Sequence, residues 1–355
     1  MSLEKLGWDI YFKNNFRPYL EKDFYAGRVI SQHKGNYVVY SEDGILKGKL
    51  SGRFMHNADV KKDYPTVGDW VVIKTINDKE VIIHDILPRK SYFSRKLTIS
   101  GGRKVRNGIV VGGHIEEQII GSNIDTAFIV IGADDNFNVQ RIERYITLVR
   151  SSKVLPVILL NKCDLCKDIP QYIKSIEAIA HDIDIHAISV LDKINMNIFR
   201  QYLCLGKTLV FLGSSGVGKS SIINYLFGDE RQRTNSVSDS NKKGKHTTTS
   251  PQLFLHQSGC MLIDTPGLRE LQLWADEDIL EESFKDIYSL IEKCKYRDCA
   301  HEKEPGCAIK AAIESGELSI KRFESYKSQL KELKVLQENR SSYYSNRKSK
   351  YTKKI

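Results

Sequence analysis

The sequence lacks the features that mark membrane, secreted and repeat proteins. No apolar run approaches the roughly 20 residues that a membrane-spanning helix needs. The opening stretch MSLEKLGWDIYFKNNF has neither the apolar segment nor the small-residue cleavage site of a signal peptide. No internal repeat is visible. Together these absences favour a cytoplasmic protein.

A disulfide framework is also disfavoured, because the chain has seven cysteines, an odd number, and shows no secretory feature. Hydrophobic residues make up 41% of the sequence and charged residues 28%, which fits a globular protein. At 355 residues the chain is long enough for two or three domains with cores of their own.

Positive charge is concentrated at the C-terminus. Residues 326–355 contain nine Lys or Arg and two Glu, so this tail supplies +7 of the formal net charge of +10. Tyr343, Tyr344 and Tyr351 lie among these basic residues. Such a tail suits RNA, through phosphate neutralisation and base stacking. The alternative, a solvated and frayed C-terminus, stays open from the sequence.

Residues 22–87 read as five short strands separated by turn signals. The predicted strands are Gly27–Gln32, Asn36–Tyr40, Ile45–Leu50, Asp69–Ile73 and Val81–Ile86. This density of strands predicts a small β-barrel of the OB type, a frequent nucleic-acid-binding platform. An SH3-like barrel would give much the same pattern. Residues 95–117 are rich in glycine and basic residues, which predicts a linker or mobile loop.

Strand and helix patterns alternate from residue 124 to residue 272. The apolar runs are Thr126–Ile131, Leu155–Leu160, Ile185–Val190, Thr208–Leu212 and Cys260–Ile263, with helical patterns at Gln140–Arg150 and Ser220–Phe227. This alternation predicts an open α/β sheet covered on both faces. Residues 278–336 read as helical, with a Cys/His cluster inside them.

A phosphate-binding loop follows the apolar run Thr208–Leu212. The segment from Gly213 to Ser220 matches G-x-x-x-x-G-K-[ST], and a helical segment that Gly228 is expected to cap comes next. Its amides and helix N-terminus favour an anion, Lys219 would reach the β- and γ-phosphates, and Ser220 would ligate Mg²⁺. The predicted contacts are Gly213, Ser214, Ser215, Gly216, Val217, Gly218, Lys219, Ser220 and Ser221. The alternative is a glycine turn without a ligand.

Guanine recognition is predicted just after the run Leu155–Leu160, where the chain reads Asn161-Lys162-Cys163-Asp164. The Asp164 carboxylate can accept from guanine N1–H and the exocyclic amine, a donor pair that adenine lacks. Asn161 would bridge neighbouring loops and the Lys162 stem would pack over the base. Ser189 fits a second base-contacting loop, and this match rests on one serine alone. Cys163 and Cys166 form C-x-x-C, which we interpret as incidental.

The remaining nucleotide motif is Asp264-Thr-Pro-Gly267, after the apolar run Met261–Ile263. Asp264 would hold Mg²⁺ through water, and the Gly267 N–H would touch the γ-phosphate. In translation-factor-related GTPases, which these motifs resemble, the phosphate loop precedes N-K-x-D. Here N-K-x-D precedes it, which indicates a circularly permuted domain whose new ends fall in an exposed loop.

The Cys/His cluster predicts a structural zinc site. It has the spacing Cys-x₄-Cys-x-His-x₅-Cys, and three thiols with one imidazole complete a tetrahedral Zn²⁺ site. The predicted ligands are Cys294, Cys299, His301 and Cys307. The alternative is buried, reduced cysteines beside an unrelated histidine.

The motifs together resemble the ribosome small-subunit-dependent GTPase A family, also called RsgA or YjeQ. The resemblance rests on the permuted order, Gly244-Lys-His-Thr-Thr-Thr249, Asp264-Thr-Pro-Gly-Leu268 and the run from Cys294 to Cys307. It implies a GTP-hydrolysing protein that binds the bacterial 30S subunit and its 16S rRNA late in maturation. We expect a monomer. Lys245 stands where the family commonly has Arg, and residues 97–117 are longer and richer in glycine than expected.

The resemblance implies three domains: an OB-fold RNA-binding domain at 1–90, a permuted GTPase domain at 91–277 and a zinc-binding helical domain with its basic tail at 278–355. Leu268 stands where many GTPases place the Gln that orients water. We therefore hypothesise that His246 supplies this function once the ribosome orders its loop; alternatively it binds RNA or faces solvent. Either Thr248 or Thr249 would ligate Mg²⁺.

Two other readings compete with a ribosome-assembly GTPase. An RNA-binding protein with a vestigial nucleotide site is disfavoured by the intact Lys219, Ser220 and Asp264. A P-loop enzyme acting on a small molecule, such as a kinase, would leave N-K-x-D unexplained.

Overall fold

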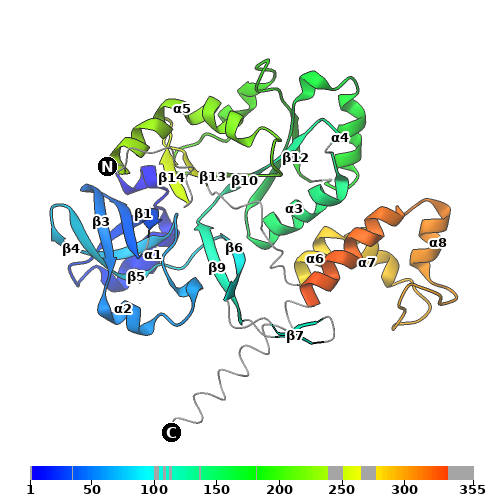
Figure 1. The fold of residues 1–355 in the computed structure, drawn as a ribbon, viewed down its shortest axis with the longest axis horizontal. Helices are drawn as coiled ribbons and strands as arrows, with labels where there is room; N and C mark the ends of the chain where they lie inside the picture. Colours follow the sequence, from blue (N-terminus) through cyan, green and yellow to red (C-terminus); the bar gives the residue numbers. More distant parts are fainter. Residues whose placement is uncertain are drawn as a thin grey trace, which may run out of the picture. The chain divides into compact units, whose positions relative to one another are not determined.

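A computed structural model describes residues 2–33, 35–99, 104–106, 109–111, 114–135, 137–180, 182–238, 251–264 and 277–334 (Figure 1). His246, Thr248, Thr249, Gly267 and the tail beyond residue 334 lie outside this part of the chain. The chain divides into two compact units. The first holds residues 1–137, 152–174 and 181–272, and the second holds 138–151, 175–180 and 273–355.

The N-terminal strands form a closed five-stranded barrel. Its strands are β1 (Tyr25–His33), β2 (Asn36–Ser41), β3 (Gly44–Leu50), β4 (Trp70–Asn77) and β5 (Glu80–Ile86). Their order is β1-β2-β3-β5-β4, and β1 closes the barrel by pairing with β4. All pairs are antiparallel except β3–β5, which is parallel. This parallel pair identifies the OB type over an antiparallel SH3-like barrel.

Short helices surround the barrel strands. Three precede β1, namely η1 (Leu3–Leu6), α1 (Ile10–Phe16) and η2 (Arg17–Tyr19), while α2 (Gly52–Asn57) and η3 (Lys61–Asp63) lie between β3 and β4. Asp9 caps α1, because its side chain accepts from the backbone N–H of Tyr11 at 3.0 Å. Trp8 and Phe12 of this segment contact the buried Trp70, so the N-terminal helices close one end of the barrel core.

The predicted α/β sheet is present and continues into the barrel. Its strands are β10 (Thr126–Gly132), β11 (Leu155–Asn161), β12 (Asp184–Ala187), β13 (Thr208–Leu212), β14 (Gln252–Leu255) and β15 (Met261–Asp264). Their order is β12-β11-β10-β13-β15-β14, all parallel except β14. β14 then pairs with β1 at Ser31–Gln252, which makes one sheet of 11 strands.

Both faces of this sheet are buried at its centre, as the continuous apolar runs predicted. All seven residues of β10 are buried. One face packs against η5 (Met196–Gln201) and α5 (Lys219–Ser238), which contribute Phe199, Ile222 and Phe227 to the core. α4 (Ile169–Glu177) and η4 (Cys163–Leu165) lie between β11 and β12 in the chain.

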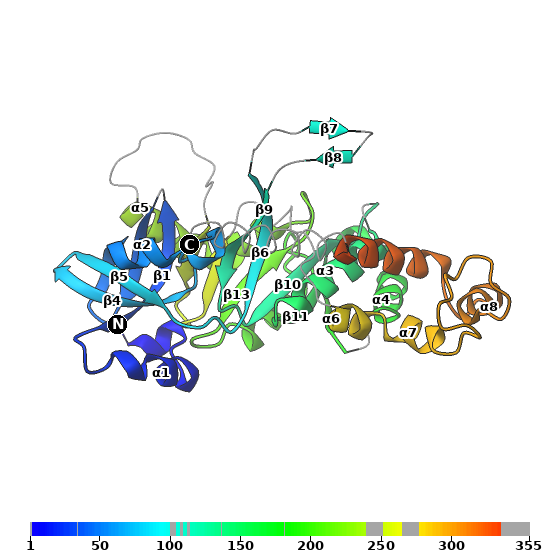
Figure 2. The same cartoon turned by 90° about the horizontal axis from the view of Figure 1, so that it is seen from below.

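Two sequence expectations need correction. The stretch 95–117, expected as a linker or mobile loop, contains the ends of β6 (Tyr92–Ile99) and β9 (His114–Ser122), with β7 (Lys104–Arg106) and β8 (Ile109–Val111) between them (Figure 2). β6 pairs with β9 over eight residue pairs, and β7 with β8 over three. The strand-forming residues around the glycines, such as Phe93 and Ile119, outweigh the composition.

The second correction concerns α5, which continues through Gly228 to Ser238 instead of ending there. A helical glycine costs only about 1 kcal/mol, and the residues that follow it are compatible with a helix. No strand was predicted at β14, because it has only four residues and its hydrogen bonds are made with β15 and β1.

The second compact unit gathers helices from separate parts of the chain. The barrel and the α/β sheet form one compact unit, and α3 (Val139–Ser151) belongs with the C-terminal helices. These helices are α6 (Glu277–Ser283), α7 (Lys285–Ile291), α8 (Ala308–Ser315) and a helix over 320–334. Arg144 forms a two-pronged ion pair with Glu332, and Arg322 binds the buried Glu143 at 2.6 Å.

No described helix is long and apolar enough to cross a membrane.

A buried arginine joins the barrel to the α/β sheet. Arg28 of β1 is 1% exposed, and its donors reach segments that are distant in the sequence. The acceptors are the carbonyls of Leu6, Gly68 and Asn123, the Thr208 hydroxyl and the Met261 sulfur. Burial lowers the pKa of Arg28 to about 10, although Asp125 and Asp69 favour its charged form.

We expect Arg28→Met to lower the free energy of unfolding by about 2–4 kcal/mol, because several buried acceptors lose their donor. Urea titration of the whole chain measures this loss. Arg53→Met at an exposed position is the control and should change stability by less than about 0.5 kcal/mol. Equal effects of the two substitutions would contradict the role of Arg28.

Candidate functional site

The carboxyl ends of the parallel strands carry the predicted nucleotide-binding residues. β11 ends at Asn161, the turn at Ser189 follows β12, the phosphate loop follows β13 and Asp264 ends β15. Parallel strands present these ends at one edge of the sheet, which is where ligands bind in open α/β folds. The permuted chain order therefore still brings these loops to one edge.

The phosphate loop adopts a conformation that only glycine accommodates easily. Gly213, Gly216 and Gly218 all have positive φ angles, of 139°, 81° and 99°. A Cβ atom at Gly213 would lie 2.3 Å from the carbonyl oxygen of Val130. α5 begins at Lys219, so the loop leads directly into a helix N-terminus, which favours a bound anion.

Lys219 is directed at the loop itself. Its Nζ donates to the carbonyl oxygens of Gly213 and Ser214, each at 2.6 Å. Val217 is buried, whereas Ser215, Gly216, Ser220 and Ser221 are exposed. The loop thus offers its hydroxyl groups and one ammonium group at an accessible surface.

Asn161 links the N-K-x-D loop to the phosphate loop. Its side chain is buried, and Nδ2 donates to the Val217 carbonyl at 2.8 Å. A Cβ atom on Gly218 would lie only 2.1 Å from this Nδ2. The Asn161 Oδ1 atom is buried without a hydrogen-bond partner among the described residues. An unpaired buried acceptor is costly, which favours a site that a ligand or water completes.

The other two residues that the sequence predicts to recognise the base lie beside Asn161. Asp164 sits half-buried in η4, and Lys162 adopts a left-handed conformation with φ of 67°. The Cys163 N–H donates to the Ile188 carbonyl at 3.2 Å, so this loop is joined to the turn at Ser189. Ser189 is fully buried, and its Oγ accepts from the Asp192 N–H at 3.2 Å.

Cys163 and Cys166 show no sign of a separate reactive site. Burial and the adjacent Asp164 raise the pKa of the Cys163 thiol, which disfavours the reactive thiolate. Sequence reasoning did not single out Asp134, which lies at this edge of the sheet and whose carboxylate binds Lys162 Nζ at 2.8 Å. Like the recognised motifs it is a polar residue just beyond a buried strand, β10, and this was the available signal.

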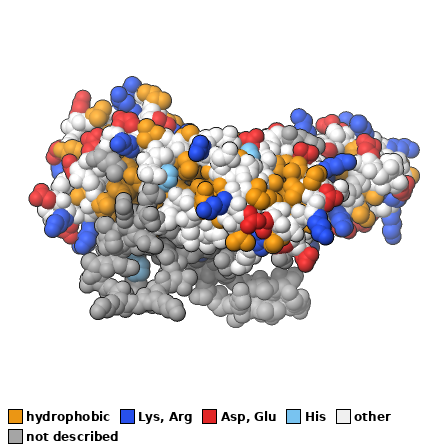
Figure 3. Space-filling model, turned by 90° about the horizontal axis from the view of Figure 1, so that it is seen from above, with side chains coloured by type: hydrophobic (Ala, Val, Ile, Leu, Met, Phe, Trp, Pro, Cys, Tyr) orange, Lys and Arg blue, Asp and Glu red, His pale blue; other side chains and the backbone are white. Residues whose placement is uncertain are grey.

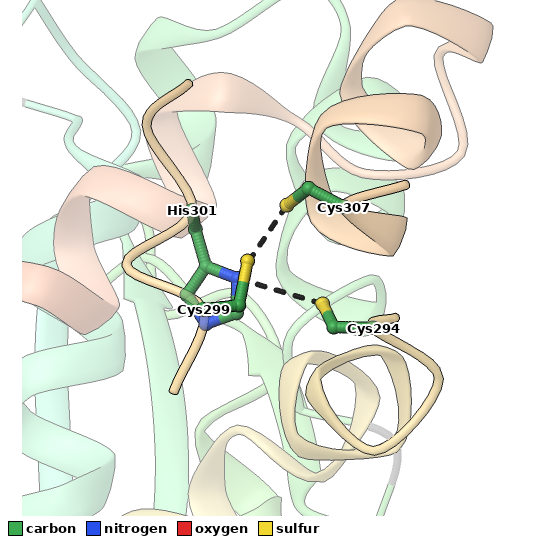
Figure 4. Close-up of side chains that lie close together, drawn as sticks. All are labelled: Cys294, Cys299, His301 and Cys307. Carbon is green, nitrogen blue, oxygen red and sulfur yellow. Dashed lines mark hydrogen bonds between the residues drawn. The ribbon is translucent and has the colours of Figure 1, made fainter. Parts of the chain in front are cut away.

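The four predicted zinc ligands lie together in the C-terminal unit (Figure 4). Cys294 follows α7, Cys307 immediately precedes α8, and Cys299 and His301 lie on the loop between them. The four ligand atoms lie within 4.8 Å of one another. His301 Nδ1 is 3.6 Å from the Cys294 Sγ and 3.5 Å from the Cys307 Sγ. A tetrahedral ion with Zn–S of about 2.3 Å and Zn–N of about 2.0 Å gives N···S separations near 3.5 Å.

Backbone hydrogen bonds shape the loop that carries this Cys/His cluster. The Glu304 carboxylate accepts from the N–H groups of Ala300, Glu302 and Lys303 at 2.9–3.1 Å. Backbone N–H donors, first its own and then these three, lower the pKa of Glu304 to about 2. Burial lowers the pKa of His301, which favours the neutral imidazole that a metal requires. The donor set and its spacing therefore fit one metal ion without an open coordination position.

The fold and these sites together define a circularly permuted GTPase-type domain with an N-terminal OB-type barrel and a C-terminal helical unit carrying a Cys₃His cluster. The chain belongs to the RsgA GTPase family, whose model matches residues 86–274. The resemblance and the fold class inferred from the sequence are thereby confirmed.

Relatives and solved structures cover nearly the whole chain. Small ribosomal subunit biogenesis GTPase RsgA of Opitutus terrae is 37% identical over 336 residues, covering 92% of this chain and 88% of the relative. The protein of the same name from Leptospira interrogans is 39% identical over 340 residues, covering 94% and 89%. YjeQ from Thermotoga maritima superposes with a TM-score of 0.61 at 25% identity, covering 87% and 98%. YloQ, described as a circularly permuted GTPase, gives 0.58 at 28%, covering 89% and 97%.

The Cys/His cluster generates a test of metal binding. We expect the purified chain to contain about one metal ion, and Cys307→Ser to contain almost none, because a hydroxyl is a poor substitute for a thiolate ligand. Elemental analysis gives the content of each protein. Cys204→Ser, at an exposed cysteine outside the cluster, is the control and should retain the ion. Retention of the metal by Cys307→Ser would contradict the site.

Proposed function

We propose that this chain hydrolyses GTP to GDP and phosphate on the small ribosomal subunit and assists late maturation of that subunit. The observation that carries the proposal is the bond from Asn161 to the Val217 carbonyl, because it unites a base-recognition loop with a phosphate loop. The relatives named small ribosomal subunit biogenesis GTPase support the ribosomal partner.

The residues at this edge receive the roles that their motifs predict. The amides of 213–218, with Ser220 and Ser221, would surround the phosphates, and Lys219 would exchange its two carbonyl partners for phosphate oxygens. Asp164 would read guanine, Asn161 would hold the loops together and Ser189 would support the base loop. Gly267 would contact the γ-phosphate.

Magnesium would be held by Ser220, by Asp264 through water and by Thr248 or Thr249. Bound there, it neutralises the charge that develops on the phosphates during transfer. Ser220 lies in the first turn of α5, which follows β13, and Asp264 ends β15, the parallel neighbour of β13, in keeping with a shared ion. We assign the Cys₃His cluster to structural zinc, since three thiols and one imidazole are the ligand set that this ion prefers.

The partner is the 30S subunit with its 16S rRNA, and the chain acts as a monomer. We assign residues 1–90 as the RNA-binding barrel, 91–277 as the permuted GTPase domain and 278–355 as the zinc-binding domain. Exposed lysines on the helix over 320–334 favour a polyanionic partner. They are Lys321, Lys327, Lys331 and Lys334. Figure 3 shows one face of the molecule, on which Lys and Arg side chains are scattered among Asp and Glu.

The geometry of Gly218 generates a prediction about nucleotide affinity. Gly218→Ala should weaken binding of GTP and GDP about 10- to 100-fold, because alanine is strained at the φ of 99° found here and its methyl group would displace the Asn161 amide. Titration with a fluorescent guanine nucleotide measures the change. Gly228→Ala is the matched control, since a Cβ there meets nothing within 4 Å, and its affinity should equal that of the wild type. Unchanged affinity in Gly218→Ala would refute the role of this contact.

Turnover with purified small subunits tests the function itself. We expect the subunits to raise phosphate release from GTP, and this stimulation to fall steeply with salt because phosphate contacts release counterions. His246→Ala should lose the stimulated turnover while GTP affinity stays nearly intact, because the imidazole is assigned to orienting water. A rate of GTP hydrolysis that small subunits do not raise, or an equal rate of ATP hydrolysis, would overturn the proposal. If small subunits stimulate GTP turnover by the His246→Ala variant as fully as by the wild type, only the proposed role of His246 is contradicted.

A further inference from the structure

Asp134 is an acidic residue beside the Asn161–Asp164 loop, at the carboxyl ends of the parallel strands. None of the sequence motifs includes it. It lies two residues beyond β10, and its Oδ2 atom is 2.8 Å from Lys162 Nζ. The two side chains are only 23% and 31% exposed, so the ion pair is partly shielded from water. Partial burial makes such a pair stronger than a fully exposed one.

The backbone fixes both ends of this pair. β10 and β11 are parallel neighbours with Gly132 opposite Asn161, and the Ala133 N–H donates to the Asn161 carbonyl at 2.8 Å. Lys162 leaves the strand in a left-handed conformation, which sets the direction of its side chain. Asp134 and Lys162 therefore start from loops that are held against each other by a backbone hydrogen bond.

Gly132 provides an independent sign that the Asp134 carboxylate has a required position. A Cβ atom at Gly132 would lie 2.8–2.9 Å from the carboxylate carbon and both its oxygens. The carboxylate thus folds back over the end of β10 in a space that only glycine leaves open. A larger residue at position 132 would push Asp134 away from Lys162.

Holding Lys162 by its ammonium group has a direct chemical consequence. A lysine side chain loses rotamer entropy when it is ordered, which costs free energy. The pair with Asp134 orders the side chain before any ligand arrives, so binding need not supply that cost. With its charge engaged, the methylene stem is left as an apolar surface against which a planar ring can pack.

We propose that Asp134 is a positioning residue for the guanine base: it fixes Lys162 so that the lysine stem forms one wall of the base pocket. This inference rests on the proposed function, because it takes Asn161–Asp164 as the guanine-recognition loop. Asp134 touches Lys162 and acts on the nucleotide only through it.

The test measures Kd for GDP and GTP by titration of the full chain with their fluorescent mant derivatives. Asp134→Asn should raise both Kd values about three- to tenfold, since only the base end of the site changes. The turnover rate at saturating GTP should stay within about twofold, because the phosphate loop is untouched. Asp134→Glu, which keeps the charge, should recover most of the affinity.

A double-mutant cycle with Lys162→Met separates positioning from general damage. If Asp134 acts through Lys162, adding Asp134→Asn to Lys162→Met should cause no further loss beyond about twofold. Asp125→Asn is the matched control, because it removes the similar 2.9 Å pair with Lys207 next to the first residue of β13, at the opposite end of the strand from the phosphate loop. It should leave both Kd values unchanged.

Each outcome decides one question. Unchanged Kd values in Asp134→Asn, or additive losses in the double mutant, would overturn the positioning role. Tighter binding by Asp134→Asn would overturn it as well, because the carboxylate would then withhold Lys162 from the nucleotide. Failure of the wild-type chain to bind either guanine nucleotide would instead refute the proposed function, so the two failures are distinguishable.

Discussion

The first compact unit depends on the hydrogen bonds of the Arg28 guanidinium group. It is buried, and it donates to the segment before the barrel, to the barrel itself and to the strands β13 and β15. A buried charge is tolerated only when hydrogen bonds replace its hydration. These bonds form only when all the contributing segments are in place, so Arg28 makes the barrel and the α/β sheet one cooperative structure.

That continuity has a functional consequence because of where the two strands lead. β13 runs from Thr208 into the phosphate loop, and β15 runs from Met261 to Asp264. Arg28 binds both strands at their first residues, at the end opposite the nucleotide edge. The barrel is thereby anchored to the same two strands that carry the proposed phosphate and magnesium residues.

Circular permutation leaves this edge intact for a simple geometric reason. In a parallel sheet the carboxyl ends of all strands face the same side, whatever their order in the chain. Asn161 therefore reaches the Val217 carbonyl even though its strand precedes the phosphate-loop strand by some fifty residues. Gly218 is needed at this junction because any Cβ would occupy the position of the Asn161 amide.

Much of this protein could be read from its sequence because the signals are local. The barrel strands, the central strands of the sheet, the loop from Gly213 to Ser220 and the Cys₃His spacing each depend on residues close together in the chain. Alternation, glycine placement and ligand chemistry act over a few residues, so they are visible without a fold. The four cysteine and histidine ligands accordingly lie together as their spacing indicated.

Only the tertiary structure decided the features that join distant segments. The pairing of β14 with β1, the burial of Arg28, the grouping of α3 with the C-terminal helices and the ion pair of Asp134 with Lys162 link residues from 28 to more than 200 positions apart. The hairpin of β6 and β9 likewise overrode a glycine-rich composition. Such contacts exist only once the chain has folded, since their free energy comes from partners that no local pattern specifies.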